Sequence, residues 1–536
     1  MSKSAKITVH PEYKIGLVDR RLYGAFLEPI RRNVYGSIWN PKHPEADDMG
    51  FRQDVLRLIK EFGLPQVRLP GGNWISGWEW ENSIGPVSER KAQIDFAWRQ
   101  IEPNTIGHDE YLEWSKRANI EPIYTLNLGT ADIKDAFHCI DYSIGPGGTY
   151  WSELRKKYGR PDPYPIRTWC LGNEMDGQWQ IGSWEKDPKG YGVKSNEIAK
   201  LIKWMNPACE TVVCGSSGPH NSTYPQWDMD VLEQCYDNVD QVAIHHYYTV
   251  PEGNLDALLN SSLAIEDFIK TTLASCDFMK AKLKSRKTMM VAFDEYGVHA
   301  GKEAEPVYWY DGRRENTMEF RNDFMTRPFV RYDNCEYDAE GPRRPAMSEM
   351  LLTLSLNAIA MTLLRHADRV KVGCFVPFIQ RALGMDQHHV HKTALYYAYE
   401  QLNKYGQGVS VMPVVNGPVH DVKQTRTDFV RQTPDYEGVQ LIEGAATVNE
   451  EKGEAAVFYI NKDQYNDIPV ELDLRGFEGY KLLEHTEMFS EDLDAKNTFE
   501  NQEVIKPKPA AGTKMEGGVI YTAAKKLSWN CIRLIK

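Results

Sequence analysis

The chain has 536 residues, 42% of them hydrophobic and 11% aromatic, which is enough for a large core and for two domains. Its formal net charge is −12 and no basic stripe offsets it, which argues against nucleic acid and anionic membrane surfaces as partners. No apolar window reaches membrane-spanning length and no secretory signal opens the chain, so we expect a cytoplasmic protein.

The first segment, residues 1–14, contains the β-like stretch "AKITVH". It comes too early to be the first strand of the domain that follows. We therefore expect it to join a sheet formed by the C-terminal part of the chain.

Residues 15–407 alternate β-rich apolar runs with amphipathic helical patterns, such as "FRQDVLRLIKEFG" at 51–63. The runs are 22–28, 65–70, 120–127, 168–174, 211–217, 241–248, 288–296 and 370–377. Eight such strands separated by helices predict an α/β fold with a closed (β/α)8 TIM barrel. An open doubly wound sheet is the alternative, but no glycine-rich phosphate loop follows any strand.

The pattern changes in residues 408–536, which contain short strands separated by turn residues. In "IPVELDL", Val470, Leu472 and Leu474 alternate with Glu471 and Asp473. Such alternation is typical of strands with one buried face. We predict a C-terminal antiparallel β-sandwich, jelly-roll-like in form.

Two acids close predicted barrel strands. Glu174 ends the fourth run in "TWCLGNE", and Glu295 lies near the end of the seventh in "VAFDEYG". In TIM barrels the reactive groups stand at the C-terminal ends of the strands, so the two carboxylates can face each other across a ligand. Glycoside hydrolysis requires such a pair. Either acid alone could equally be a solvated strand-end residue.

Other strand ends carry groups that suit a ligand rich in hydroxyls. These are Glu28, Arg68, Asn73, Asn127, His245 and Tyr247. Arg68 could instead be a structural ion-pair partner of Glu28 or Glu295. His245 could be an ordinary core histidine.

Nine motifs in order resemble glycoside hydrolase family 51, the α-L-arabinofuranosidases. They are "GAFLEP", "VRLPGGNWISGWEWENSIGP", "NLGT", "GGTYWSELR", "TWCLGNEMDGQWQIG", "VVCGSS", "FDEY", "LLRHADRVK" and "LSWNCIRL". The resemblance implies an exo-acting, retaining enzyme that releases terminal α-L-arabinofuranosyl residues from oligo- or polysaccharides, often as a homo-oligomer such as a hexamer. It also implies that Glu174 is the acid/base and Glu295 the nucleophile. The residues that it implies contact the sugar or orient the acids are Glu28, Arg68, Asn73, Asn173, His245 and Tyr247.

The chain departs from the family pattern near the predicted pocket. Tyr296 and His299 replace two tryptophans after the nucleophile, and Pro377 replaces a glutamine of the eighth strand. We include Tyr296 among the substrate-binding residues. Residues 300–347 are long for this position and rich in charge, with Arg313, Arg314 and Arg321 as candidate glycan contacts.

These departures leave two alternatives to an arabinofuranosidase open. The same catalytic pair could be retuned to a galactofuranoside or a substituted glycan, or the barrel could bind sugar without turnover. We expect no cofactor. We also expect no metal: no CxxC pair occurs, and "HHVH" at 388–391 lacks the spacing of known zinc signatures.

Overall fold

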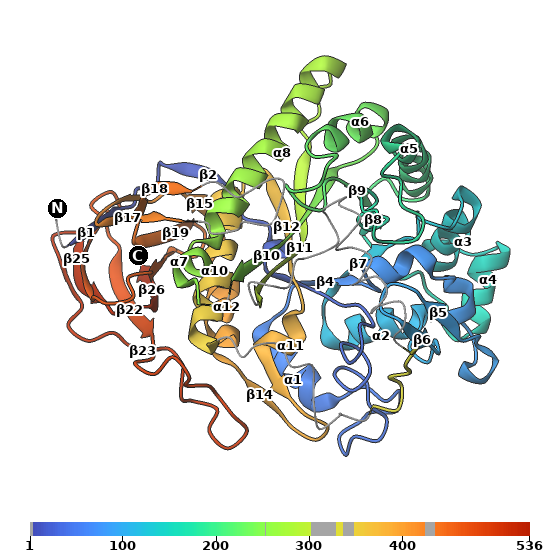
Figure 1. The fold of residues 1–536 in the computed structure, drawn as a ribbon, viewed down its shortest axis with the longest axis horizontal. Coiled ribbons are helices and arrows are strands. Elements are labelled where there is room, and N and C mark those ends of the chain that lie inside the picture. Colours follow the sequence, from blue (N-terminus) through green and yellow to red (C-terminus); the bar gives the residue numbers. More distant parts are fainter. Residues whose placement is uncertain (1–3, 252, 302–327, 336–347, 424–434) are drawn as a thin grey trace.

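A closed barrel of eight parallel strands forms the centre of the molecule (Figure 1). The computed structural model describes residues 4–251, 253–301, 328–335, 348–423 and 435–536. Around the barrel, in chain order, lie β3 (Gly24–Phe26), β4 (Gln66–Leu69), β7 (Glu121–Thr125), β8 (Thr168–Leu171), β9 (Glu210–Cys214), β10 (Gln241–Pro251), β11 (Met290–Gly301) and β12 (Val370–Phe375). Every strand overlaps a predicted run, and the TIM-barrel prediction is confirmed.

Helices cover the outside of the barrel. The longer ones are α1 (Gln53–Phe62), α2 (His108–Ala118), α3 (Ile133–Ile144), α4 (Tyr150–Lys157), α5 (Pro188–Met205), α6 (Gln226–Cys235), α8 (Ser261–Leu283), α10 (Glu349–Arg365) and α12 (Ala394–Tyr405). Two short ones are α7 (Leu255–Leu259) and α11 (Phe378–Ala382). The predicted helix at 51–63 is α1, which ends at Gly63. Gly63 has φ 72°, and its N–H bonds the carbonyls of Ile59 and Lys60, a common helix stop.

The inside of the barrel is filled by apolar side chains. They are Phe26, Ile123, Cys170, Val212, Ala243, Ala292, Val372, Cys374 and Val376. Because these residues close the interior, a ligand can reach only the ends of the barrel, and the polar residues that follow the strands lie at the C-terminal end.

Two stacked sheets form the second part of the structure, at the left of Figure 1. The five-stranded sheet has the order β16 (Val414–Asn416), β1 (Ala5–Thr8), β21 (Ile468–Asp473), β25 (Val519–Ala524) and β24 (Lys514–Glu516). The seven-stranded sheet has the order β2 (Lys14–Leu17), β15 (Val409–Val411), β19 (Ile442–Asn449), β20 (Glu454–Asn461), β26 (Ser528–Ile535), β22 (Lys481–Met488) and β23 (Lys508–Pro509).

Most pairs in these sheets are antiparallel, as predicted, but β1 pairs with β21 in parallel. The N-terminal strand thus lies between two C-terminal strands, β16 and β21. The division of the chain after residues 14 and 407 stays a prediction.

The middle strands of the seven-stranded sheet, β19, β20 and β26, are buried on both faces. In β20, Val457 and Tyr459 belong to the core between the two sheets, whereas Phe458 and Ile460 belong to the barrel core. On that second side the sheet contacts α10 and α12, and Trp529 Nε1 donates to Gln401 Oε1 of α12 at 2.8 Å. The helix α10 is mostly apolar and is buried along nearly its whole length, because it lies between the barrel and this sheet.

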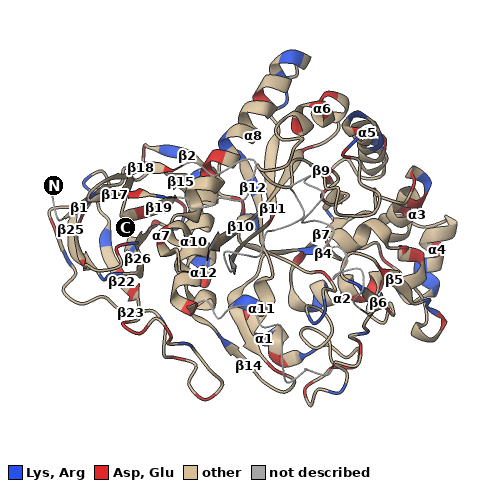
Figure 2. Ribbon diagram, in the orientation of Figure 1, with Lys and Arg blue, Asp and Glu red and all other residues tan. Residues whose placement is uncertain are grey.

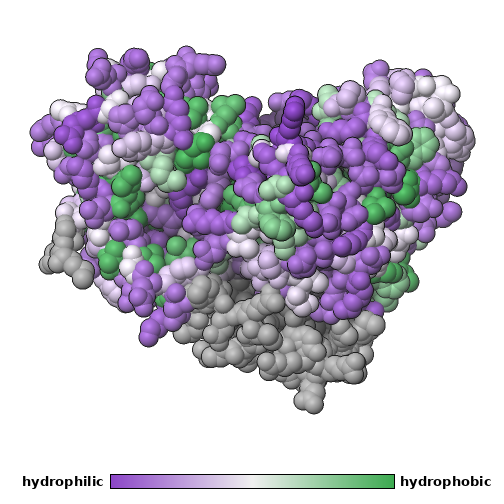
Figure 3. Space-filling view, turned by 90° about the horizontal axis from the view of Figure 1, so that it is seen from above, coloured by the Kyte–Doolittle hydropathy of each residue, from purple (hydrophilic) through white to green (hydrophobic). Residues whose placement is uncertain are grey.

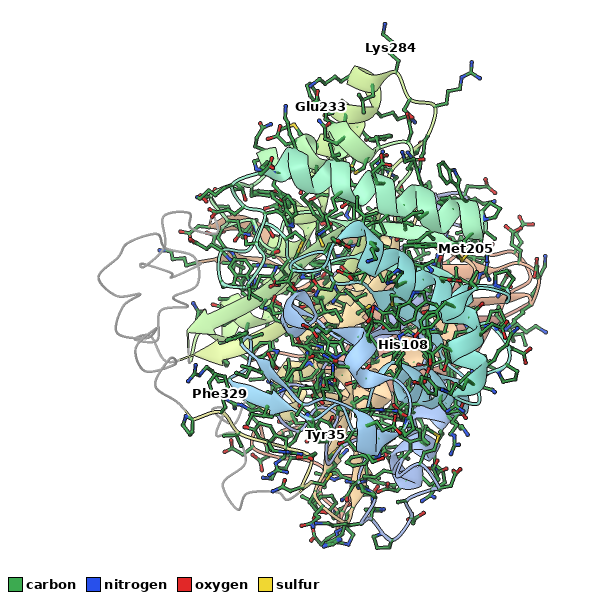
Figure 4. All side chains as sticks on the ribbon, turned by 90° about the vertical axis from the view of Figure 1, so that its right-hand side faces the viewer. Tyr35, His108, Met205, Glu233, Lys284 and Phe329 are labelled. Carbon is green, nitrogen blue, oxygen red and sulfur yellow. The ribbon has the colours of Figure 1, made fainter. Side chains whose placement is uncertain are left out.

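Charges of both signs are mixed over the molecule (Figure 2). One face is mainly hydrophilic, with hydrophobic residues in small separate patches (Figure 3). Figure 4 shows Lys284 at the outer end of α8, and His108 among the interior side chains. All nine cysteines are buried and free. Among the described residues, no helix is both long and apolar enough to cross a membrane.

Candidate active site

Glu174 lies in the loop that follows β8, three residues beyond the last strand residue. Its φ is 47°, in the left-handed region that residues with a side chain rarely adopt. This backbone turn directs the side chain back over the barrel, where it is only 6% exposed. The indole N–H of Trp179 donates to Glu174 Oε2 at 2.8 Å.

Glu295 lies within β11, beside an irregularity of the strand. The pairing of β11 with β12 shifts between Phe293 and Tyr296. These two residues both belong to the outer core, and the two between them, Asp294 and Glu295, both contact Arg68 of the barrel interior. Such bulges re-aim side chains and are frequent next to active sites.

The two glutamates meet above the barrel interior. One oxygen of Glu174, one oxygen of Glu295 and a ring nitrogen of His245 all lie within 4.8 Å of one another. His245 Nδ1 is 3.1 Å from Glu174 Oε1 and 3.7 Å from Glu295 Oε2. The carboxylates predicted from strands four and seven therefore do face each other, and His245 lies between them.

Arg68, near the end of β4, makes hydrogen bonds and ion pairs with several residues of this site. Its Nη1 donates to Glu295 Oε1 at 2.6 Å, and its Nη2 donates to Asn173 Oδ1 at 2.8 Å. Its Nε is 2.8 Å from Asp294 Oδ2. Asn173 in turn donates from Nδ2 to Asn73 Oδ1 at 2.9 Å. One buried guanidinium thus links three barrel strands.

His245 carries a positive charge in this environment. Burial by itself lowers its pKa, but the Glu295 and Asp294 carboxylates outweigh burial and raise the pKa to about 10. Both ring nitrogens are then donors, with Nε2 3.2 Å from Asp294 Oδ1. Burial raises the pKa of Glu295, and the charges of His245 and Arg68 oppose that effect. Tyr247 also donates to Glu295 Oε2 at 2.7 Å.

Glu28 lies beside Glu295. A Cβ added to Gly72 would meet Glu295 Oε1 at 3.1 Å and Glu28 Oε2 at 3.3 Å, so any larger residue there would press on both acids. Glu28 Oε1 accepts the backbone N–H of Trp74 at 3.1 Å. Burial raises the pKa of Glu28 to about 8, and the negative charge of Glu295 adds to the rise. Glu28 is therefore mostly protonated at neutral pH.

The structure brings most of the predicted site residues together. Glu28, Arg68, Asn73, Asn173, Glu174, His245, Tyr247 and Glu295 form one connected group. Tyr296 is not part of it. Its ring packs on Phe293 and Phe375, and its hydroxyl lies 3.0 Å from the hydroxyl of Tyr399 on α12. The structure therefore does not support a place for Tyr296 in the pocket, because the bulge turns it to the outside of the barrel.

Sequence reasoning missed three residues of this group. Asp294 joins Arg68 to His245. Trp179 donates to Glu174, and Gln180 Nε2 donates to the backbone carbonyls of Asn173 and Glu174 at 2.6 and 2.5 Å. The signal was available only for Asp294, which directly precedes a predicted catalytic acid.

Among the described residues, two groups of side chains bring possible metal ligands together. One is Glu174 with His245 and Glu295, and the other is Glu81 with Asp135 and His138. His388, His389 and His391 are in neither group. His389 is 3.3 Å from Asp386, and His391 Nε2 lies 3.0 Å from the carbonyl of Asn497, so these histidines serve local contacts.

The other departures from the family pattern are Pro377, His299 and three arginines of the segment after β11. Pro377 follows β12 and precedes α11, where it is half-buried. Arg313, Arg314 and Arg321 fall in 302–327, outside the described residues, as does the side chain of His299.

Comparison with known proteins gives consistent matches along the chain. The family model of the α-L-arabinofuranosidase 1 domain matches residues 58–262, and that of the α-L-arabinofuranosidase C-terminal domain matches residues 294–528. The chain is 35% identical to an intracellular exo-α-(1→5)-L-arabinofuranosidase of Acetivibrio thermocellus, over the full length of both. It is 36% identical to intracellular exo-α-(1→5)-L-arabinofuranosidase 1 of Bacillus subtilis, over 100% of this chain and 99% of the relative.

A solved structure is similar over nearly the whole chain. It is a family 51 α-L-arabinofuranosidase from Bifidobacterium longum, with 27% identity and a TM-score of 0.84. The match covers 99% of this chain and 100% of the other.

Proposed function

Because the chain belongs to glycoside hydrolase family 51, the α-L-arabinofuranosidases, we propose that it releases terminal α-L-arabinofuranosyl residues from oligo- or polysaccharides in an exo-acting manner. The observation that carries the proposal is the pair of buried carboxylates, Glu174 and Glu295. One oxygen of each lies within 4.8 Å of the other at the C-terminal end of the barrel.

The proposed reaction is a retaining double displacement. Retaining enzymes hold the two carboxyl groups about 5–5.5 Å apart, whereas inverting enzymes hold them roughly 6.5–9.5 Å apart to admit a water molecule. The approach of the Glu174 and Glu295 oxygens to within 4.8 Å supports the shorter arrangement.

In the first step, Glu295 attacks the anomeric carbon while Glu174 gives its proton to the glycosidic oxygen of the leaving group. This produces a covalent glycosyl-enzyme and a free alcohol. In the second step, Glu174 takes a proton from water, which attacks the anomeric carbon and releases Glu295. Arg68 and Tyr247 support the role of Glu295, because their donors stabilise its anionic form.

The other residues of the group would bind the sugar or orient the two acids. Glu28, protonated at neutral pH, can donate a hydrogen bond as well as accept one. Asn73 and Asn173 supply amides beside the carboxylates. His245 links Glu174 to Asp294 and so sets the orientation of the acid/base.

A pocket retuned to a galactofuranoside or a substituted glycan remains the second candidate. Pro377 favours it, since a proline in place of the family's glutamine offers the sugar no side-chain amide and no backbone N–H. Tyr296 gives it no support, because its ring packs outside the barrel. The non-catalytic alternative is disfavoured by the number of contacts that hold the two acids in place.

The test compares kcat/KM on 4-nitrophenyl α-L-arabinofuranoside, the matching β-D-galactofuranoside and arabino-oligosaccharides. We expect the arabinofuranosides to be preferred. Preference for the galactofuranoside would favour the retuned pocket, and no turnover of any of them would leave only sugar binding.

We also propose that the protein acts inside the cell, in keeping with the names of the two relatives, and as a homo-oligomer such as a hexamer. Light scattering of the purified protein measures its mass directly. A mass of one chain would contradict the oligomer.

A further inference from the structure

The outer face of the five-stranded sheet lies on the side of the sandwich away from the barrel, where β1 and β25 form the left edge of Figure 1. Ile7, Val470 and Ile520 point inward to the sandwich core. Their sequence neighbours Lys6, Glu471 and Tyr521 alternate with them and therefore point outward. The alternation thus gives the sheet an outer face with polar side chains, which does not pack against the sandwich core.

Four residues form a continuous row across this face. Asn416 pairs with Lys6, Lys6 with Glu471, and Glu471 with Tyr521, each in register on neighbouring strands. We call this set the sheet row. With strands about 4.8 Å apart, the row spans about 14 Å, which is longer than one sugar ring.

The sheet row lines a surface hollow of about 660 Å³. Pro469 and Val419 also line it and add apolar surface. Tyr521 is 46% exposed, so a large part of its ring is open to a ligand. A tyrosine offers a rigid apolar ring together with a polar hydroxyl, and it loses little conformational entropy on binding.

The charges of this face neutralise one another. Lys6 Nζ lies 3.2 Å from both Glu471 Oε1 and Asp473 Oδ2. Arg475 pairs with Asp473 as well. Two cations match two anions in this network, and the exposed Lys514 and Glu516 of β24 add one charge of each sign to the face. An ionic ligand would have to displace an existing pair of the network. A neutral ligand with many hydroxyls can bond to the outer lone pairs and N–H groups while the pairs stay intact.

We propose that the sheet row is a second glycan-binding site, which holds an internal segment of a neutral polysaccharide while a chain end occupies the catalytic site. The occupant follows from the face itself: an open aromatic ring, an exposed amide at Asn416 and paired charges. The identity of the polymer as an arabinan rests on the proposed function.

The test measures binding apart from catalysis. Native gel electrophoresis with soluble debranched arabinan is run in a Glu295→Gln background, so that the polymer is not digested. Tyr521→Ala should weaken retardation, with an apparent Kd roughly three- to tenfold higher, and Tyr521→Phe should keep it. Tyr465→Ala is the matched control, because Tyr465 is 82% exposed and lies outside the sheet row. Equal retardation of Tyr521→Ala and the parent would overturn the proposal.

Kinetics with Glu295 intact provide the second readout. Tyr521→Ala should raise KM on arabinan and leave kcat/KM on 4-nitrophenyl α-L-arabinofuranoside unchanged. An equal loss on both substrates would mean a general structural defect and would contradict the proposal.

Two further outcomes are separable. If Tyr521→Ala lowers the mass measured by light scattering but binds arabinan normally, the face is a contact between copies of the chain and the proposal is wrong. If the native chain fails to cleave the small substrate, the proposed function fails, whereas the gel comparison still decides the second site.

Discussion

The two catalytic acids are held in different ways at the ends of β8 and β11. Glu295 is part of a strand, and a buried arginine and a tyrosine donate to its two oxygens. Glu174 lies beyond its strand in a left-handed turn, where Trp179 and His245 are its polar contacts. A nucleophile that must stay anionic has a fixed cation beside it. The acid/base, which must gain and lose a proton, is positioned by its backbone turn and by two ring N–H donors, of which the one on His245 is charged.

The first prediction concerns the replacement of Glu295, the acid within strand β11. Glu295→Ala should lower kcat on 4-nitrophenyl α-L-arabinofuranoside by about 10⁴-fold or more, because no glycosyl-enzyme can form. Steady-state assays and trapping of the intermediate by mass spectrometry measure this. A covalent adduct in the variant would contradict the assignment.

The second prediction concerns the replacement of Glu174, the acid in the left-handed turn after β8. Glu174→Ala should lower kcat by about 10²–10⁴-fold on substrates with poor leaving groups, because proton transfer is lost. With 4-nitrophenol as leaving group, azide should restore part of the rate, since a small anion can replace activated water. The same rescue in Glu295→Ala with retained configuration would reverse the two roles.

The third prediction concerns one of the hydrogen bonds to Glu295. Tyr247→Phe removes the 2.7 Å donor to Glu295 Oε2. Hydrogen bonds to charged groups contribute about 1.5–3 kcal/mol, so kcat/KM should fall roughly 10- to 100-fold. Thermal unfolding of the variant serves as control. An unchanged rate would mean that Arg68 and His245 set the state of the nucleophile without Tyr247.

The fourth prediction concerns the acid beside Glu295. Glu28 has a folded pKa of about 8 against an ordinary value of 4.5, so the folded chain keeps a proton that the unfolded chain releases. Its contribution to stability is present below pH 4.5 and is lost as the pH rises to 8. Relative to Glu28→Gln, the unfolding free energy of the native chain should fall by up to about 1.4 kcal/mol per pH unit across that window. Urea unfolding at several pH values tests this, and parallel curves would refute it.

The fifth prediction compares the two backbones directly. At residue 174, with φ 47°, Gly should be more stable than Ala by about 1 kcal/mol, because only glycine adopts this conformation without strain. At residue 295, inside a strand, Ala should be more stable than Gly by roughly 0.5–1 kcal/mol. Chemical denaturation of the four variants should give opposite signs at the two sites. The same sign of the Gly–Ala difference at both residues would contradict the different backbone conformations assigned to them.

Much of the fold was predictable because it depends on periodicity. Eight apolar runs correspond to eight barrel strands, and Val470 and Leu472 of β21 and Leu474 just after it all point into the sandwich core, as their alternation predicts. The parallel pairing of β1 with β21 could not be predicted, because it joins segments more than four hundred residues apart and no local pattern encodes it.

The site was predictable as far as strand ends define it. Both glutamates and their polar neighbours follow from the rule that parallel strands end at one edge. The bulge in β11 breaks the alternation from which a side chain's direction is inferred. It turns Tyr296 out of the pocket and brings Asp294 in. Trp179 belongs to a loop, where sequence carries no periodic signal at all.

Because the middle strands of the seven-stranded sheet are buried on both faces, the barrel and the sandwich cannot be separated freely. Phe458 and Ile460 belong to the same apolar core as the helices α10 and α12, so the barrel cannot be trimmed to a minimal catalyst without opening that core to water. The sandwich is thus not an interchangeable module of the kind that engineers append to enzymes. Recombination between relatives would have to exchange the sheet and the two helices as one block.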